Sequence, residues 1–156
     1  MSNPFHYTKP EMVKELLAIT PIKITDSVLD AGSGLNKVWY NTLENKNKYE
    51  CEIDEGKDYF DWDIKVDWVI GNPPFHLGWK FFEKSLDIAN VGIAMLGNIN
   101  FMNSTCLPSR LEKAKEKGFY LQSIHIVQDK RWFGRYFYLI FTKTNNNLIT
   151  FNNKVF

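Results

Sequence analysis

Apolar residues along the chain follow two spacings, one typical of amphipathic helices and one typical of short buried strands. In residues 9–19 they recur at helical spacing behind Pro10, a residue that suits the first turn of a helix. Residues 66–70 instead form a compact apolar run that stops at Gly-Asn-Pro-Pro. The same criteria predict further helices at 35–45, 78–89 and 109–117, and further strands at 27–30, 49–53, 91–96, 121–127 and 136–141.

Strand and helix patterns alternate through most of the chain and end in a pair of strands typical of a hairpin. This order predicts one α/β domain over residues 1–156, with a sheet that is parallel in the main and has one antiparallel strand. In such sheets ligands bind beyond the carboxyl ends of the strands. Because the unusual loops 31–34 and 71–75 both follow strands, we expect them to share one cleft.

The composition is that of an ordinary globular domain, with 44% hydrophobic and 24% charged residues. No apolar run approaches the roughly 20 residues that a membrane span needs, and the first residues lack the layout of a secretory signal. The two cysteines predict neither a disulfide framework nor a metal site, and the three histidines are not at metal-ligand spacing. We therefore expect a cytoplasmic protein without a bound metal and without membrane contact.

Charge is distributed unevenly between the two halves of the chain. Residues 1–78 hold 8 Lys and 13 Asp or Glu, whereas residues 79–156 hold 11 Lys or Arg and 5 Asp or Glu. This division is compatible with a polyanion on the second half and a cationic ligand near the first. A solvated basic face without a partner is an equally simple interpretation.

A glycine turn follows the first predicted strand, in the sequence Val-Leu-Asp-Ala-Gly-Ser-Gly-Leu-Asn. Gly32 and Gly34 allow a sharp turn and the close approach of a ligand to the backbone. A dinucleotide fingerprint would place a third glycine where Lys37 stands, which counts against NAD or FAD. Asp30 at the strand end suits a ligand with an ammonium or sulfonium group. A plain strand-to-helix turn is the alternative.

An acidic residue, Glu52, ends the next predicted strand, at the spacing of about 20 residues at which a carboxylate accepts both hydroxyls of a ribose. Together with the glycine turn it predicts a ribose site. Glu50 and Asp54 are its neighbouring competitors, and a surface glutamate is the alternative.

The sequence Asn72-Pro73-Pro74-Phe75 directly follows a buried strand. Two prolines stiffen the loop and remove two backbone donors, so that it presents carbonyl acceptors. The asparagine adds a side-chain oxygen, and the phenylalanine offers a ring that can stack on a planar base. These features predict a site for an –NH2 group on an aromatic or amide carbon, with a buried structural turn as the alternative.

The order Asp-Ala-Gly-Ser-Gly, Glu-Ile-Asp, Asp-Tyr-Phe-Asp-Trp and Asn-Pro-Pro-Phe resembles the amino-methylating branch of the class I, Rossmann-like methyltransferases, most of all the N6-adenine DNA methyltransferases. The opening Phe-His-Tyr-Thr-Lys-Pro-Glu-Met-Val is similar to their N-terminal motif, with Lys9 inserted before Pro10. The segment Arg-Trp-Phe-Gly-Arg-Tyr-Phe-Tyr-Leu-Ile-Phe resembles the region where the family places a second base-packing aromatic. The likeness covers residues 5–143.

The resemblance implies S-adenosyl-L-methionine as the cofactor and assigns roles by position. The cofactor would be held by Tyr7 and Thr8 at its methionine end, by Asp30, Gly32 and Gly34 at its centre, by Glu52 at the ribose, and by Ile53 and Asp58 at the adenine. The target nitrogen and its base would be held by Asn72, Pro73, Pro74 and Phe75. His76, Lys130, Arg131, Trp132, Phe133 and Arg135 would bind the rest of the substrate, with Trp132 or Phe133 closing the other side of the base.

Two features depart from the family pattern. Only residues 54–65 separate the second strand from the next apolar run, and a parallel crossover needs about that length by itself. We therefore expect an abbreviated second βαβ unit, and Asp61 or Asp63 could replace Asp58. The sequence also ends soon after the last predicted strand, where DNA-specific relatives usually carry a target-recognition domain. We therefore expect sequence specificity that is low, or recognition that is supplied by loops, by a protein partner or by self-association.

The resemblance implies N6-adenine methylation of nucleic acid, with DNA favoured and RNA as the nearest alternative. Protein glutamine methylation is a third hypothesis, because a side-chain amide presents the same –NH2 geometry. A catalytically silent binding subunit is the fourth.

Overall fold

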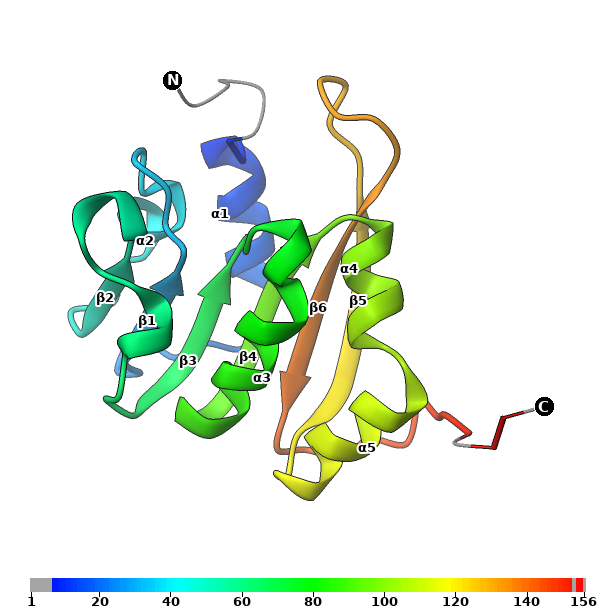
Figure 1. Cartoon of the computed structure of the whole chain (residues 1–156). Coiled ribbons are helices and arrows are strands. Elements are labelled where there is room, and N and C mark those ends of the chain that lie inside the picture. Colours follow the sequence, from blue (N-terminus) through cyan, green and yellow to red (C-terminus); the bar gives the residue numbers. More distant parts are fainter. Residues whose placement is uncertain (1–6, 153, 156) are drawn as a thin grey trace.

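The computed structural model describes residues 7–152, 154 and 155. A six-stranded sheet has the order β2-β1-β3-β4-β6-β5 (Figure 1). Its strands are β1 (Val28–Ala31), β2 (Lys48–Cys51), β3 (Val66–Gly71), β4 (Ala89–Gly97), β5 (Tyr120–Val127) and β6 (Tyr136–Thr142). Neighbouring strands from β2 to β4 are parallel, and β6 runs antiparallel to both β4 and β5. The predicted α/β sheet with one antiparallel strand is confirmed.

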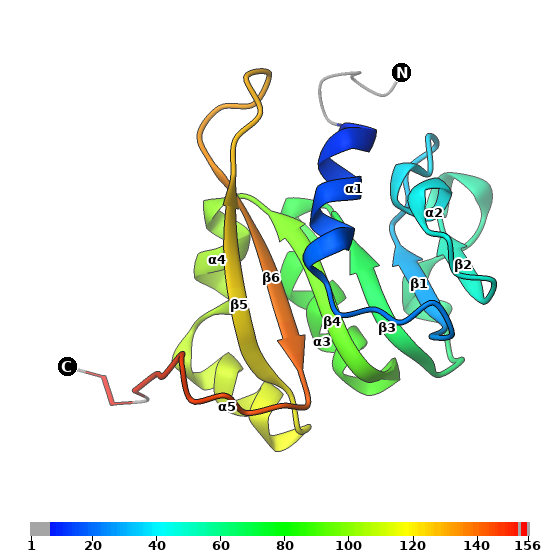
Figure 2. The same cartoon turned by 180° about the vertical axis from the view of Figure 1, so that it is seen from behind.

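Helices cover both faces of this sheet. On one face lie α3 (Gly78–Ile88), α4 (Ile99–Thr105) and α5 (Pro108–Glu116), and on the other lie α1 (Pro10–Ile19) and α2 (Val38–Thr42) (Figures 1 and 2). None of the helices in the described part of the chain is long and apolar enough to cross a membrane.

Most predicted elements occur within a few residues of their expected bounds, with two differences. The helix expected over 35–45 forms only over Val38–Thr42, because the glycine turn extends into its first residues. The spacing of apolar residues did not predict α4, which begins where the Asn98 side chain accepts a hydrogen bond from the Phe101 backbone N–H.

The abbreviated second βαβ unit is also confirmed. Residues 52–65 contain two short 3-10 turns, Ile53–Glu55 and Tyr59–Asp61, and no strand. As a result β2 is the edge of the sheet, and the chain passes directly from β2 to β3. This short path places residues 52–60 beside the carboxyl ends of β1 and β3 (Figure 1).

Two apolar clusters fill the space between the sheet and its helices. One lies under α3, α4 and α5 and includes Phe82, Phe101 and Phe141. The other lies under α1 and α2 and includes Trp39 and Trp68. In this second cluster Trp68 lies opposite Gly92 on the neighbouring strand, and a Cβ on that glycine would come within 2.3 Å of the indole.

The carboxyl ends of β1 and β3 meet at a glycine. Gly71, the last residue of β3, has φ of +139°, and a Cβ there would lie 2.8 Å from the Ala31 carbonyl oxygen and 3.1 Å from Asp30 Oδ1. Only a residue without a side chain fits this approach. Gly71 therefore fixes the distance between the two loops that carry the sequence motifs.

We expect Gly71→Ala to destabilise the protein more than Gly56→Ala, because both residues have a positive φ but only at Gly71 does an added Cβ meet backbone. Backbone strain alone costs on the order of 1–3 kcal/mol, and overpacking adds about 1–3 kcal/mol. Urea unfolding of both variants measures the difference. Equal losses would show that the junction of β1 and β3 tolerates a side chain.

Candidate active site

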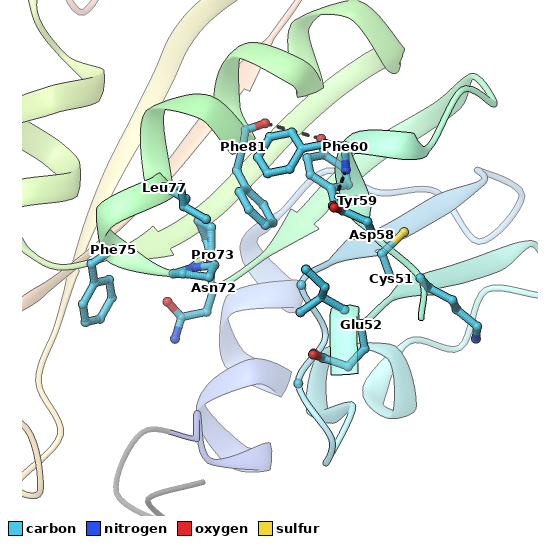
Figure 3. Close-up of a pocket in the computed structure, with 15 residues that line it drawn as sticks. Cys51, Glu52, Asp58, Tyr59, Phe60, Asn72, Pro73, Phe75, Leu77 and Phe81 are labelled. Carbon is cyan, nitrogen blue, oxygen red and sulfur yellow. Dashed lines mark hydrogen bonds between the residues drawn. The ribbon is translucent and has the colours of Figure 1, made fainter. Parts of the chain in front are cut away.

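A cavity of about 610 Å³ lies at the carboxyl ends of β1, β2 and β3. It is lined by Gly32 and Gly34, residues 51–53 and 57–60, residues 72–75, Leu77 and Phe81. Figure 3 shows Asn72 and Glu52 on opposite sides of this cavity, with the Phe81 ring between them. The two unusual loops share one cleft, as their positions after strands predicted.

The glycine turn has the backbone that only glycine adopts readily. Gly32 and Gly34 have φ of +69° and +67°. A Cβ on Gly32 would lie 3.2 Å from the Phe81 ring, and one on Gly34 would lie 3.4 Å from the Tyr7 ring. The Ser33 N–H donates a 2.8 Å hydrogen bond to the Cys51 carbonyl, which ties the turn to the end of β2. The turn is thus a rigid floor onto which a ligand can approach closely.

Asp30 lies beneath this turn with its side chain fully buried. Its Oδ2 accepts a 3.0 Å hydrogen bond from the Tyr40 N–H, whereas its Oδ1 has no hydrogen-bond partner in the described part of the chain. The pKa of Asp30 is raised to about 8, mainly by burial and in smaller part by the carboxylates of Glu50 and Glu52, while the Tyr40 hydrogen bond acts in the opposite direction. Asp30 is not among the cavity-lining residues, and its Oδ1 lies toward Gly71, 3.1 Å from the position of a Cβ there. It would therefore act on a positive charge in the cavity through its field rather than by direct contact.

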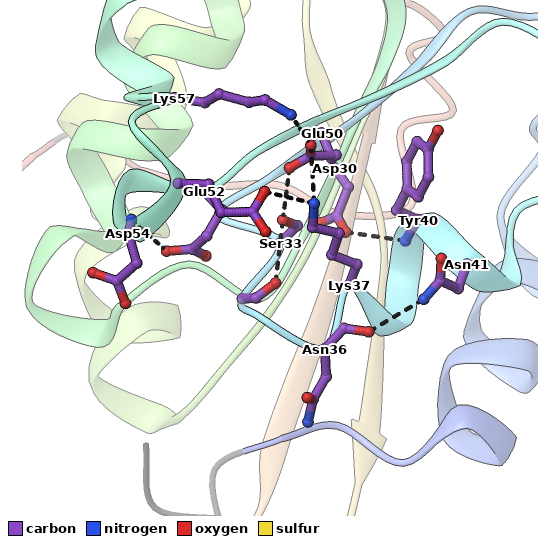
Figure 4. A network of polar contacts seen from close by, with 12 residues as sticks. Asp30, Ser33, Asn36, Lys37, Tyr40, Asn41, Glu50, Glu52, Asp54 and Lys57 are labelled. Carbon is purple, nitrogen blue, oxygen red and sulfur yellow. Dashed lines mark hydrogen bonds and ion pairs between the residues drawn. The ribbon is translucent and has the colours of Figure 1, made fainter. Parts of the chain in front are cut away.

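A polar network surrounds the end of β2 (Figure 4). Glu50 accepts hydrogen bonds from Ser33 at 3.2 Å, from Lys37 at 3.3 Å and from Lys57. Burial opposes ionisation of this carboxylate, but the two lysines together outweigh it and hold the pKa of Glu50 below its ordinary value. Glu50 is therefore committed to the scaffold and is not among the cavity-lining residues.

Of the three acids considered for the ribose, Glu52 is the one that lines the cavity. Its side chain is buried, and Oε1 accepts a 3.1 Å hydrogen bond from the Asp54 N–H. The neighbouring Ile53 also lines the cavity, and 67% of it is exposed. An acceptor beside an open apolar surface is suited to a sugar joined to a flat ring.

Asp58 lines the cavity next to Tyr59, whereas Asp61 and Asp63 are not among its lining residues. One Asp58 oxygen, Oδ1, accepts a 2.9 Å hydrogen bond from the Phe60 N–H. The geometry therefore favours Asp58 among the three aspartates left open by the sequence, although its contact with a cofactor stays a prediction.

The Asn-Pro-Pro-Phe loop forms the opposite wall. The Asn72 amide nitrogen lies 3.4 Å from Thr8 Oγ1, and its Oδ1 is buried with no partner among the described residues. The Pro74 carbonyl accepts a 2.9 Å hydrogen bond from the Leu77 N–H and so closes a 3-10 turn. The Pro73 carbonyl lies one residue before this turn. The loop thus has a side-chain acceptor and a backbone acceptor close together in sequence.

The N-terminal motif lies across both loops. Its first two residues, Phe5 and His6, are outside the described residues, but Tyr7 packs on Gly34 and Thr8 contacts Asn72. Arg131 holds this segment by donating a 3.0 Å hydrogen bond to the Tyr7 carbonyl.

Arg131 also pairs with Asp129, whose carboxylate is buried. The guanidinium donates to Asp129 at 2.6–3.1 Å and holds the pKa of that carboxyl low, at about 2. Lys9 lies 4.0 Å from the same carboxylate. Arg131 is therefore engaged within the protein, and its predicted contact with substrate stays a prediction.

An aromatic row connects the cavity to the loop between β5 and β6. Phe75, on the cavity wall, lies 5.7 Å from Tyr136 between ring centroids, and Tyr136 lies 4.3 Å from Trp132. The other residues predicted to bind substrate are exposed and do not line the cavity, namely His76, Lys130, Phe133 and Arg135.

A scan of protein-family models and a search of curated proteins give no match to the chain. Solved structures do share its fold. TrmN from Thermus thermophilus aligns with a TM-score of 0.62 over 88% of this chain and 49% of its own, at 20% identity, so this chain spans about half of TrmN. Precorrin-6y C5,15-methyltransferase from Geobacter metallireducens aligns with a TM-score of 0.63 over 91% and 92%, at 13% identity.

Magnesium protoporphyrin IX methyltransferase from Synechocystis, solved with bound SAM, aligns with a TM-score of 0.59 over 86% of this chain and 77% of its own, at 13% identity. The chain has the class I methyltransferase fold. In this fold the candidate site occupies the carboxyl edge of the sheet, where ligands of open α/β sheets bind.

Several residues that shape this site are not among those predicted from the sequence. Phe81 forms its roof, stacking on Tyr59 at 4.7 Å and meeting Phe60 edge to face at 5.1 Å. The run Asp-Tyr-Phe-Asp-Trp pointed to two of these rings, but Phe81 is one of several aromatics on an amphipathic helix. Gly71 carried a signal in its position directly before Asn72.

Burial of Asp30 makes stability depend on pH. The native state keeps the Asp30 proton up to about pH 8, whereas the unfolded chain, with the ordinary pKa of 3.8, loses it far earlier. Because the native state binds more protons in this window, this group lowers the free energy of unfolding as pH rises from about 4 to about 8.

We expect Asp30→Asn to flatten this fall and to be more stable than the cofactor-free parent protein above about pH 8. Urea unfolding between about pH 5 and about pH 9 measures the slope. A variant whose stability follows that of the parent across the whole range would contradict the assignment of the slope to Asp30.

Proposed function

We propose that the chain is an S-adenosylmethionine-dependent methyltransferase that acts on the N6 amino group of adenine in nucleic acid, DNA being favoured over RNA. One observation carries the proposal. A single cavity has the glycine turn and the Glu52 carboxylate on one side, and the unpaired amide oxygen of Asn72 on the other.

The glycine side of the cavity fits the cofactor. Gly32 and Gly34 line the cavity with backbone that carries no side chain, and the buried carboxyl of Asp30 beneath them would stabilise the positive end of the molecule through its charge. Glu52 would accept the ribose hydroxyls, and Ile53 would pack on the adenine ring. Two neighbours with this fold, the Synechocystis enzyme and TYW2 from M. jannaschii, were solved with SAM or AdoMet, which supports this cofactor.

The Asn-Pro-Pro-Phe side fits an amino group on a flat base. Such a nitrogen is a poor nucleophile, because its lone pair is conjugated with the ring. Hydrogen bonds from its two hydrogens to Asn72 Oδ1 and the Pro73 carbonyl would favour a tetrahedral nitrogen with an available lone pair, and Phe75 would stack on the base. S-adenosylmethionine supplies the electrophilic methyl group, and the nitrogen releases one proton to solvent. The protein contributes orientation and fixed dipoles rather than a strong base.

The fold alone does not select this substrate. Among the neighbours are enzymes named for protoporphyrin, for precorrin and for ribosomal protein L11. The proposal for adenine therefore rests on the acceptor pair of Asn72 and Pro73 and on Phe75. The basic second half of the chain adds charge complementarity to a polyanion.

A labelled-methyl transfer assay against DNA, RNA and protein in parallel tests the function. We expect label in DNA, and digestion to nucleosides should yield N6-methyladenine. Label in RNA alone would identify RNA rather than DNA as the substrate. Label in protein glutamine would replace nucleic acid with protein as the substrate. A protein that binds the cofactor and labels none of the three would be the silent subunit.

We expect Asn72→Ala to lower kcat by at least about a hundredfold, the scale seen when one preorganised polar group is removed from an active site. Cofactor affinity, measured by calorimetry, should stay near that of the parent protein. Asn145→Ala, at an exposed position, is the control for loss of an amide. Loss of cofactor binding together with transfer would place Asn72 in the cofactor site instead.

We expect Glu52→Gln to weaken binding of S-adenosylmethionine by about tenfold to a hundredfold, the value of a charged hydrogen bond. Asp54→Asn removes a charge two residues away without touching the cavity lining, and should change binding far less. If both variants bind like the parent protein, the ribose lies elsewhere.

A further inference from the structure

The loop between β5 and β6 carries at its tip an aromatic residue, Phe133, whose side chain is fully exposed to solvent. Phe133 is 104% exposed, and the next residue, Gly134, has φ of +80° with open space around the position of a Cβ. Figures 1 and 2 show this loop, in orange, extending past the edge of the sheet at which β3 ends. At this exposure both faces of the Phe133 ring are open to contact with a partner.

The base of the same loop is firmly held. Asp129 is 4% exposed and accepts hydrogen bonds from the Arg131 guanidinium. The neighbouring Trp132 packs on Tyr136. Arg131 and Trp132 therefore both make contacts within the protein. Phe133, one residue further on, is presented to the solvent from a rigid support.

Charge at the loop tip is positive. Lys130 and Arg135 flank Phe133 and are both exposed, and Asp129, the one acid among residues 128–135, pairs with Arg131. An exposed ring between two cations fits a chain of flat bases joined by phosphates, because the ring stacks while the cations pair with the backbone.

The tip lies next to the site of the target base but is separate from it. Phe75 on the cavity wall contacts Tyr136, and Tyr136 contacts Trp132. A strand whose target base entered the cavity at Phe75 would therefore continue along this aromatic row toward Phe133.

We propose that Phe133 stacks on the base adjacent to the target nucleotide, and that Lys130 and Arg135 bind the phosphates beside it. The inference rests on the proposed function and names a nucleic-acid strand whose target base has left the stack as the substrate. In an intact stack both faces of every base are covered by neighbours. Removal of the target exposes one face of the adjoining base, and Phe133 covers that face.

Binding of a single-stranded oligonucleotide with one adenine, and with 2-aminopurine next to it, tests the proposal. We expect Phe133→Ala to raise the Kd from fluorescence anisotropy by about tenfold and to leave 2-aminopurine brighter at saturation than in the parent complex. Phe133→Trp should restore both the affinity and the quenching. Leu148→Ala, which removes another highly exposed apolar side chain, is the control.

Methyl transfer to the same oligonucleotide separates two kinds of failure. If the parent protein methylates it and Phe133→Ala changes neither Kd nor fluorescence, the stacking role is wrong and the proposed function stands. If the parent neither binds nor methylates nucleic acid, both are wrong. A rise in KM for a protein substrate in Phe133→Ala would assign the loop to a polypeptide and overturn the proposal.

We expect Lys130→Ala and Arg135→Ala each to reduce the slope of log K against log salt by roughly 0.7, the value for one phosphate of a single strand. Lys46→Ala removes an exposed cation just before β2, at the opposite edge of the sheet, and is the matched control. An unchanged slope in both loop variants would remove the phosphates from the proposal.

Discussion

The close approach of β3 to β1 at Gly71 is the constraint on which the site depends. Parallel pairing alone brings the carboxyl ends of the two strands to the same edge of the sheet. At Gly71 the chains come so close that a Cβ would lie 2.8 Å from the Ala31 carbonyl oxygen. The glycine turn after β1 and the Asn-Pro-Pro-Phe loop after β3 start from this contact, so their spacing is set by packing rather than by either loop.

The buried carboxyl of Asp30, beside this contact, lowers the stability of the folded protein but favours the binding of a cationic ligand. With one oxygen unpaired, its ionised form is disfavoured in the native protein, and its pKa is raised to about 8. A cationic ligand above the turn would reverse this preference, because a nearby positive charge stabilises the carboxylate. Binding of such a ligand would then raise the free energy of unfolding, which the buried Asp30 carboxyl lowers in the protein alone. Active sites commonly reduce the stability of their scaffold in this way.

Local features of the site could be predicted from the sequence, and long-range contacts could not. The glycine turn and the proline loop are specified by residues adjacent in the chain, and the missing strand follows from the shortness of residues 54–65. The helix α4 was missed because it is short and begins at a cap, Asn98, rather than at an amphipathic repeat. Phe81 was missed because nothing in a helix pattern tells which ring meets the glycine turn.

Arg131, which pairs with Asp129, makes another long-range contact that the sequence pattern did not predict, and this contact connects distant parts of the site. Arg131 was assigned to substrate from its place in a basic aromatic segment, yet its guanidinium bonds to the Tyr7 carbonyl, 124 residues away in the chain. Tyr7 packs on Gly34 and its neighbour Thr8 contacts Asn72, so the hydrogen bond from Arg131 connects the β5–β6 loop to both walls of the cavity. The same loop carries Phe133. A nucleic-acid strand that moved this loop would therefore also move the N-terminal segment that packs on the glycine turn. The N-terminal segment and the proposed nucleic-acid contact are thus connected through Arg131, and differential contact with this connection is what would let one ligand alter the affinity for the other.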